Sequence, residues 1–306
     1  MTAIKKRPKP VHQMTITQFE KAFPDEEACA AYLVARRWPN GVKCPRCGNA
    51  KVYALASGLH WQCTNCAPGG STGYRFSHIA GTIFENTNKP LRDWYRVTHM
   101  MLVSKKGMSA LQIMRTMGFG SYKTAWYMCH RIRVALVEND MDKLGGIVEV
   151  DETFVGGKAK NRHWKKRDGK PGPTASGKAI VAGAIQRKGN VVARMIQNVK
   201  QETLEAFVNE AVSEKVSLLC TDQWVGYKHL STKFPHGTVD HAKHQYVVGE
   251  VHTQTIEGFW SIFKRGIVGS FHKVSRKYLP LYIAEFQFRY NNRFNDDIFS
   301  TAIEGA

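Results

Sequence analysis

Two short cysteine pairs constrain this chain more than any other feature. Cys44 and Cys47 form the first pair, Cys63 and Cys66 form the second, and 15 residues separate the two. This is the spacing of a four-cysteine zinc site, because a two-residue spacer lets one tight turn direct two thiolates to a single ion. The alternative is two disulfides or four free thiols. We expect structural Zn²⁺ in a zinc ribbon, since the spacing fits a metal and the chain shows no export signal.

The net charge indicates a polyanionic partner. The chain has 306 residues, of which 44 are Lys or Arg and 25 are Asp or Glu, so its net charge is +19. An excess of this size favours binding to nucleic acid. No window reaches the about 18–20 apolar residues that a membrane span needs. We therefore expect a DNA-binding protein in a reducing, intracellular compartment, with Cys29, Cys129 and Cys220 as small core residues.

The region after the cysteine pairs is predicted to be helical. A short helix over 108–117, a glycine-containing turn and a longer helix over 122–136 fit a helix-turn-helix. An ordinary helical hairpin with a solvated basic face fits the same pattern. In the first interpretation, the residues of the second helix that would face a DNA groove are Lys123, His130, Arg131 and Arg133.

From residue 145 the pattern changes to short apolar runs that predict strands. Three strands, a helix, another strand and C-terminal helices indicate an α/β domain with a mixed sheet. We expect strands over 147–151, 179–186, 191–199 and 217–222, and helices over 202–213, 255–264 and 275–292.

A basic segment over 158–178 interrupts this domain and contains a single acid, Asp168. We expect it to be a loop between strands that contacts the DNA backbone through Lys165, Lys166 and Arg167. A solvated insert without a DNA contact is the alternative.

Three acidic residues occupy positions that binding to a shared cation would explain. Asp151 and Asp222 each close an apolar strand, where a carboxylate is costly to bury unless it is paired or binds a metal. Glu257 lies at the edge of the apolar stripe of a predicted helix. Three carboxylates that hold Mg²⁺ or Mn²⁺ make a phosphoryl-transfer site. A salt bridge or a helix cap is the alternative role for each acid taken alone.

The motifs around these acids resemble those of bacterial insertion-sequence transposases with an N-terminal zinc ribbon and a DDE catalytic domain, the ISXO-like family. The similarity covers nearly the whole chain. The runs that carry it are Phe23–Cys29 and Gly81–Phe84 around the ribbon, Glu149–Lys158, Thr221–Asp222 with Gly226–Tyr227, His252–Trp260 with Phe263–Gly266, and Phe288–Arg293.

The resemblance implies an RNase H-like fold for the C-terminal domain, with Asp151, Asp222 and Glu257 as the metal-binding triad. Lys264 lies two helical turns beyond Glu257, which suits a contact to DNA phosphate. His252 and Glu152 are weaker candidates for a part in catalysis. Glu149 shares the strand face of Asp151, so the resemblance alone ranks Asp151 above it.

The resemblance also implies three domains and a function. We expect the ribbon within 1–85, a helical DNA-binding segment over 86–143 and the catalytic domain over 144–306. The expected activity is that of a transposase that binds the ends of its element, cleaves DNA and joins the 3′-hydroxyl to target DNA. The expected partners are element ends, target DNA and further copies of the chain, in the cytoplasm and associated with the nucleoid, with no membrane.

Two rival functions belong to other classes. A tyrosine recombinase needs a nucleophilic Tyr near its basic cluster, but no Tyr lies between Tyr127 and Tyr227. A catalytically inactive zinc-ribbon regulator derived from a transposase would keep the DNA-binding parts. The intact acidic triad argues against such a regulator, and metal-dependent nicking would separate the two.

Overall fold

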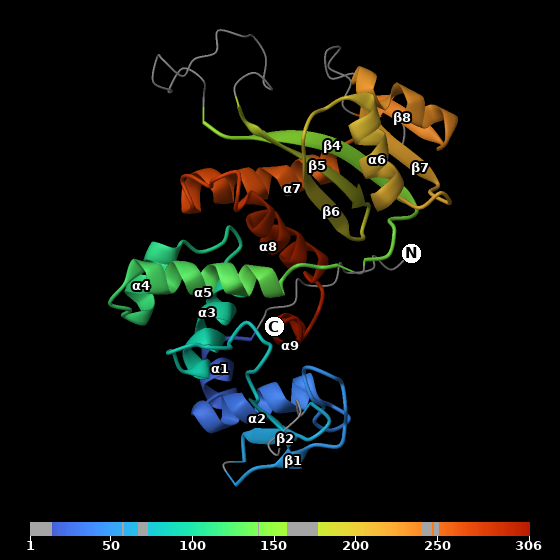
Figure 1. Ribbon diagram of the computed structural model, residues 1–306. Helices are drawn as coiled ribbons and strands as arrows, with labels where there is room; N and C mark the ends of the chain where they lie inside the picture. The colour runs from blue at the N-terminus through green and yellow to red at the C-terminus, as the bar shows by residue number, and fades with distance from the viewer. Residues whose placement is uncertain are drawn as a thin grey trace, which may run out of the picture. The chain divides into compact units, whose positions relative to one another are not determined.

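The computed structural model describes residues 14–56, 58–66, 73–139, 141–157, 177–239, 247 and 251–306. It divides into two compact units (Figure 1). The first contains Met1–Ser104, Met108–Val137 and Arg293–Ala306, and the second contains Lys105–Gly107 and Glu138–Asn292. The three-domain division expected from the sequence stays a prediction. Among the described residues, none of the helices is both long and apolar enough to cross a membrane.

The first unit contains the zinc ribbon that the cysteine pairs predicted. Its antiparallel sheet has the order β1-β2-β3. Trp61 and Phe76 stack across the last two strands with ring centroids 6.0 Å apart, and Trp38 meets Trp61 edge-on at 5.5 Å. The strands are β1 (Tyr53–Ala54), β2 (His60–Cys63) and β3 (Tyr74–Ser77).

The helices of the first unit come from both ends of the chain. Asp25 caps α2 by accepting a hydrogen bond from the backbone N–H of Ala28 at 2.8 Å. The last helix, α9, places Phe299 against the rings of Phe23 and Tyr95, both 5.4 Å away. The helices are α1 (Ile16–Ala22), α2 (Glu26–Arg37), α3 (Leu91–Val103), α4 (Ala110–Met117), α5 (Tyr122–Ala135) and α9 (Ile298–Glu304).

The second unit is built on a five-stranded mixed sheet with the order β6-β5-β4-β7-β8. The neighbours β4, β5 and β6 pair antiparallel, whereas β7 runs parallel to β4 and β8 runs parallel to β7. The mixed α/β domain expected from the sequence is confirmed. The strands are β4 (Ile147–Val155), β5 (Ala179–Gln186), β6 (Val191–Ile196), β7 (Leu218–Asp222) and β8 (His236–Val239).

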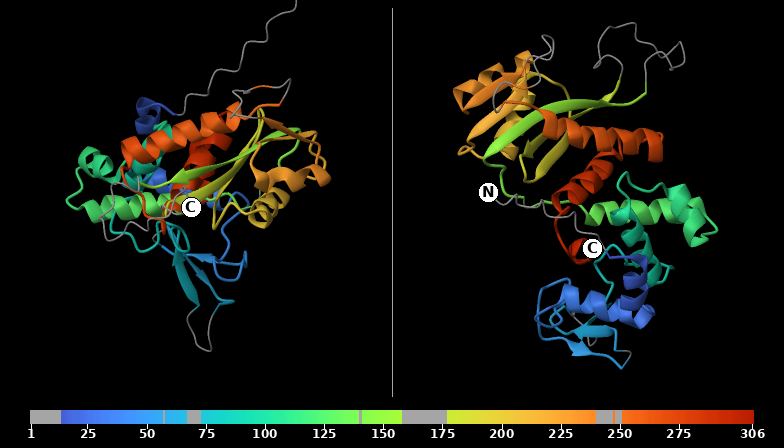
Figure 2. Two further views of the ribbon diagram at one scale, coloured as in Figure 1. Left: turned by 90° about the horizontal axis from the view of Figure 1, so that it is seen from above. Right: turned by 180° about the vertical axis from the view of Figure 1, so that it is seen from behind.

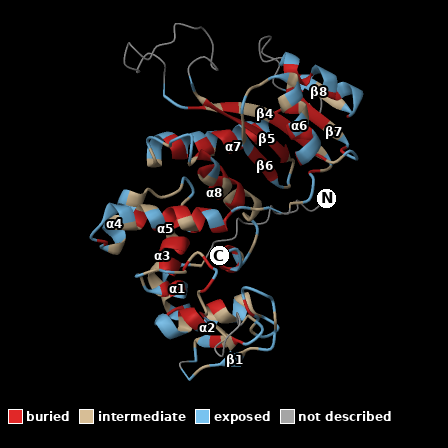
Figure 3. Ribbon diagram, viewed as in Figure 1, coloured by how far each residue is buried: buried red, intermediate tan, exposed pale blue. Residues whose placement is uncertain are grey.

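Helices cover both faces of this sheet, as Figures 1 and 2 show. One face packs against α6 (Gln201–Ala211) and the 3₁₀ helix η3 (Val225–Thr232). The other packs against α7 (Gln254–Arg265), the π-helical turn η5 (Gly266–Ser270) and α8 (Leu279–Asn291). The strands and the inner sides of α6 and α7 are buried, while the outer sides are exposed (Figure 3). This arrangement is consistent with an RNase H-like fold.

Candidate functional site

The four paired cysteines form a compact sulfur cluster in the first unit. Cys44 Sγ lies 3.8 Å from Cys66 Sγ, and Cys47 Sγ lies 3.7 Å from Cys63 Sγ. All four sulfurs lie within 4.8 Å of one another. A tetrahedral Zn²⁺ with Zn–S bonds of about 2.3 Å requires sulfurs about 3.8 Å apart. The distances therefore fit one structural zinc ion, and the alternative of two disulfides does not match these free thiols.

In the second unit the sheet register brings Asp151 and Asp222 together. β4 and β7 are parallel neighbours, and their register pairs Glu149 with Cys220. Continuing this register by two residues places Asp222 beside Asp151. Residues in register on parallel strands point to the same face, and the strands are about 4.8 Å apart. Two neighbouring strands thus present one carboxylate each on the same face of the sheet. Asp222 ends β7 as expected, but β4 continues to Val155, so Asp151 does not close its strand as the apolar run predicted.

A glycine lets the helix that carries Glu257 approach these two acids closely. Gly183 on β5 is the antiparallel partner of Asp151. A Cβ atom at Gly183 would lie 2.6 Å from Trp260 Cζ2 and 3.1 Å from Ile256 Cδ1, so only glycine fits beneath α7 at this point. Glu257 follows Ile256 in the helix and is exposed, and its Oε1 accepts a hydrogen bond from Thr253 Oγ1 at 2.8 Å.

Glu149 holds the start of the same helix against β4. Its carboxylate is fully buried and accepts hydrogen bonds from the backbone N–H groups of Thr255 at 2.7 Å and Ile256 at 3.0 Å. It also pairs with Arg187 Nε at 2.7 Å and lies 3.1 Å from His252 Nδ1. The sequence could not rank Glu149 against Asp151. The structure separates them, because the Glu149 carboxylate is occupied as a helix cap.

The charges around Asp151 form an acidic cluster. Burial and, to a smaller extent, the negative charges of Glu152, Asp222 and Glu257 together raise the pKa of Asp151 to about 7. Repulsion of this kind is what a cation relieves. Among the described residues, only the four cysteines form a group whose ligand atoms could hold an ion as they stand.

The side chain of Glu152 lies on the other face of the sheet from Asp151, although its charge still acts on Asp151. Its Oε2 accepts a hydrogen bond from the hydroxyl of Tyr227 at 2.7 Å, and Tyr227 is buried in the core on the α6 side. Burial raises the pKa of Glu152 and the charge of Asp222 adds to it, while the Tyr227 hydroxyl lowers it. The Tyr227 contact gives Glu152 a structural role that fits its lower rank in the sequence analysis.

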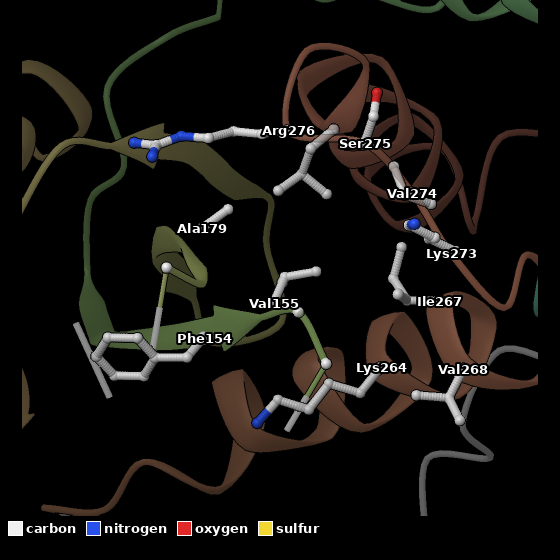
Figure 4. A pocket seen from close by; sticks show the side chains of 14 residues that line it. Phe154, Val155, Ala179, Lys264, Ile267, Val268, Lys273, Val274, Ser275 and Arg276 are labelled. Carbon is white, nitrogen blue, oxygen red and sulfur yellow. The ribbon is translucent and has the colours of Figure 1, made fainter. Parts of the chain in front are cut away.

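Lys264 is exposed near the C-terminal end of α7 and lines a pocket of 570 Å³. Figure 4 shows the pocket between the end of β4, at Phe154 and Val155, and the helical segment that carries Ile267 and Val268. The position predicted for a phosphate contact is thus open, on the same helix as Glu257.

The basic residues predicted on the second helix of the helix-turn-helix are placed differently from that expectation. α4 and α5 do pack together around Gly118, which adopts the left-handed conformation that ends α4. However, His130 and Arg133 are only 7% and 2% exposed. Arg131 is half-buried and donates a hydrogen bond to the backbone oxygen of Glu85 at 2.9 Å. This burial does not match a surface that faces a DNA groove, because His130 and Arg133 point inward from the helix. Of the four residues, only Lys123 is exposed.

The structure does not describe one group of predicted DNA contacts, and it adds two residues that the sequence did not indicate. Lys165, Lys166, Arg167 and most of the basic segment lie outside the described residues. Arg187 and Gly183 were missed as parts of the site. Arg187 directly follows β5, and nothing in its local sequence shows that it pairs with a buried glutamate 38 residues earlier.

Comparisons with known proteins agree with this arrangement. Residues 143–291 match the ISXO2-like transposase domain, and residues 24–68 match the transposase zinc-ribbon domain. A protein of Halobacterium salinarum, described as an uncharacterized protein in transposable element ISH50, is 26% identical over 280 residues, which cover 88% of this chain and 92% of the relative.

Among solved structures, a chain of the simian T-cell lymphotropic virus intasome in complex with PP2A regulatory subunit B56 gamma is similar at 12% identity with a TM-score of 0.29. The similarity covers 58% of this chain and 63%, less than two thirds, of that chain.

Proposed function

Because the chain belongs to the ISXO2-like transposases, we propose that it binds the ends of an insertion sequence and catalyses metal-dependent cleavage and strand transfer of DNA. The observation that supports this best is the convergence of three acids on one face of the sheet. Asp151 and Asp222 come from adjacent parallel strands, and Glu257 comes from the helix that packs on Gly183, the partner of Asp151.

These side chains fit a magnesium or manganese site. Carboxylate oxygens are the ligands that both ions prefer, and a bound cation would offset the burial and the mutual repulsion that together raise the Asp151 pKa. When bound, a pair of such ions would lower the pKa of an attacking water or hydroxyl and neutralise charge at the phosphate.

The proposed chemistry has two displacement steps at phosphorus. In the first, water attacks a phosphodiester at the element end, the P–O3′ bond breaks, and the proton passes to the leaving 3′-oxygen. In the second, the freed 3′-hydroxyl attacks a phosphodiester of target DNA. A new P–O3′ bond forms, the P–O3′ bond of the target strand breaks, and the proton of the attacking hydroxyl passes to the leaving 3′-oxygen of the target. Neither step requires a covalent bond to the protein, so the site needs no Ser or Tyr nucleophile.

The surrounding residues orient the three ligands. Glu149 ties the first turn of α7 to β4, and Gly183 lets the same helix approach Asp151. Lys264 lies seven residues beyond Glu257, about 10 Å along the helix. Its exposed ammonium can contact a phosphate of the DNA strand that leads to the three acids. In the first unit, the zinc ribbon and Lys123 provide further candidate contacts to the element end.

The test is cleavage of DNA that carries the element's terminal inverted repeat, in Mg²⁺ buffer. Asp151→Asn, Asp222→Asn and Glu257→Gln each remove one ligand charge at constant size, so each should abolish cleavage and leave DNA binding intact or tighter. The effects should be strongly non-additive, because one missing ligand already spoils the site. Asp142→Asn, an exposed substitution in the same unit, should cleave normally. Wild-type protein that binds the repeat without any cleavage would favour the inactive regulator instead.

A further inference from the structure

The pocket beside Lys264 has the chemistry of a nucleotide site. Its walls include the aliphatic side chains of Val155, Ile267 and Val268, and its described lining carries three cations, Lys264, Lys273 and Arg276, and no acid. Apolar walls favour a flat, weakly hydrated group, and a cationic rim favours the phosphates attached to it. A nucleotide of the bound DNA combines the two.

The size of the pocket fits the same occupant. Its volume of 570 Å³ is within the range of about 300–1,000 Å³ that is typical of small-molecule sites. A groove that only followed the DNA backbone would need cations but no apolar hollow of this volume. The space between the end of β4 and η5 is therefore suited to a base and its sugar.

The pocket is close enough to the acidic triad to be reached by a DNA strand that is bound there. Lys264 is about 10 Å from Glu257 along α7, and Val155 is about 13 Å from Asp151 along β4. Because a B-form strand advances about 3.4 Å per nucleotide, these distances correspond to no more than about four nucleotides.

A second hollow adjoins the pocket at Lys264 and Val268, which line both. It is also lined by Lys106, Arg265, Gly269 and Ser270. A DNA strand that runs from the acids along the C-terminal end of α7 thus meets further cations beside Lys264.

We propose that this pocket receives one unstacked base of the element end, within about four nucleotides of the phosphate that the carboxylates hold. The inference rests on the proposed function and goes beyond it, because it assigns a base-binding role to side chains outside the triad. Val155, Ile267 and Val268 contact the base, and Lys264, Lys273 and Arg276 contact the adjoining phosphates.

The experiment uses the full chain with a duplex of the terminal inverted repeat that carries 2-aminopurine, a base whose fluorescence rises on unstacking, at single positions near the cleavage site. Mg²⁺ is left out so that the duplex stays intact. Wild-type protein should raise the fluorescence at one position within about four nucleotides of that site. Val268→Trp, which fills the pocket from a residue that is 71% exposed, should abolish the rise and weaken binding several-fold.

An abasic duplex separates pocket filling from a general loss of binding. Removing the base at the responsive position should restore the affinity of Val268→Trp, since no base then needs the pocket. Lys273→Ala and Arg276→Ala should lower both the signal and the affinity, whereas Lys215→Ala, an exposed lysine outside the pocket, should change neither.

Three results would overturn the base site: no position responds, the Val268→Trp protein keeps the response, or it binds the intact and the abasic duplex equally weakly. Cleavage of the unlabelled repeat by wild-type protein in Mg²⁺ is measured in parallel. Cleavage without a fluorescence response rejects the base site and leaves the transposase function standing, whereas the absence of cleavage counts against that function itself.

Discussion

Cys63 and Asp151 are both candidate metal ligands on β-strands, but different forces hold their strands in place. Cys63 ends a four-residue strand, and two of the five buried members of the ribbon cluster, Cys44 and Cys63, are themselves ligands. Asp151 lies within a nine-residue strand between two hydrophobic clusters that have 16 and 15 buried members. In the ribbon the zinc site takes the place of part of the core, whereas in the α/β unit the hydrophobic core positions the proposed metal ligands.

Removing the zinc should have the largest effect and should stay within the ribbon. A structural zinc ion contributes about 10–16 kcal/mol to the folding of small zinc modules. We expect Cys63→Ser to expose the backbone amides of β2 and β3 to hydrogen exchange while β4 and β5 keep their protection. Cys129→Ala, a buried cysteine outside the cluster, should retain one zinc per chain. Equal loss of protection from hydrogen exchange in both units would contradict the claim that the zinc ion stabilises the ribbon alone.

Neutralising Glu149 should have the next largest effect, and this time in the α/β unit. Glu149→Gln leaves the Arg187 guanidinium without its buried counter-charge and weakens the cap on α7. Breaking a buried pair typically costs about 3–5 kcal/mol. Glu210→Gln removes the exposed pair with Arg194 and should cost about 1 kcal/mol or less.

Chemical denaturation of both variants measures this difference. Exchange in the ribbon should not change in either variant. If Glu149→Gln and Glu210→Gln were equally stable, Glu149 would not be the residue that fastens α7 to the sheet.

A methyl group under α7 should have a smaller effect on stability and a selective effect on the proposed metal site. Gly183→Ala places a Cβ atom 2.6 Å from Trp260, and overpacking of this kind costs about 1–3 kcal/mol. Since the displaced helix carries Glu257, we expect cleavage to require a higher Mg²⁺ concentration. Gly145→Ala, where no atom lies within 4 Å of the new Cβ, serves as the control. An unchanged Mg²⁺ requirement would mean that the close approach at Gly183 does not set the position of Glu257.

Local patterns were sufficient for most of the elements near the site. The cysteine spacing predicted the ribbon, and apolar runs predicted β4, β5, β6 and β7 to within a few residues. The strand β8 was missed because it has only four residues and contains Gly237, which leaves no periodicity to detect. The helices α1 and α9 have seven residues each and were missed for a similar reason.

Long-range pairing is what the sequence could not show. The strand face shared by Glu149 and Asp151 was predictable, but the hydrogen bonds from Thr255 and Ile256 that distinguish them join residues more than 100 positions apart. The inward direction of His130 and Arg133 was missed because a basic residue on a helix is usually solvated, and the pattern of the helix alone does not show which of its sides packs against α3 and α4. The position of Phe299 among the N-terminal helices is likewise a tertiary contact without a local signal.

The most direct test of the account is an exchange of ligand and metal at Asp222. Asp222→Cys replaces a carboxylate oxygen by sulfur, which Mg²⁺ accepts poorly and the softer Mn²⁺ accepts better. If Asp222 binds the catalytic metal, this variant should not cleave the terminal repeat in Mg²⁺ and should regain cleavage in Mn²⁺, while Asp222→Ala stays inactive in both. Cleavage by Asp222→Cys at the wild-type rate in Mg²⁺, or equal behaviour of the Cys and Ala variants in Mn²⁺, would contradict metal binding by Asp222.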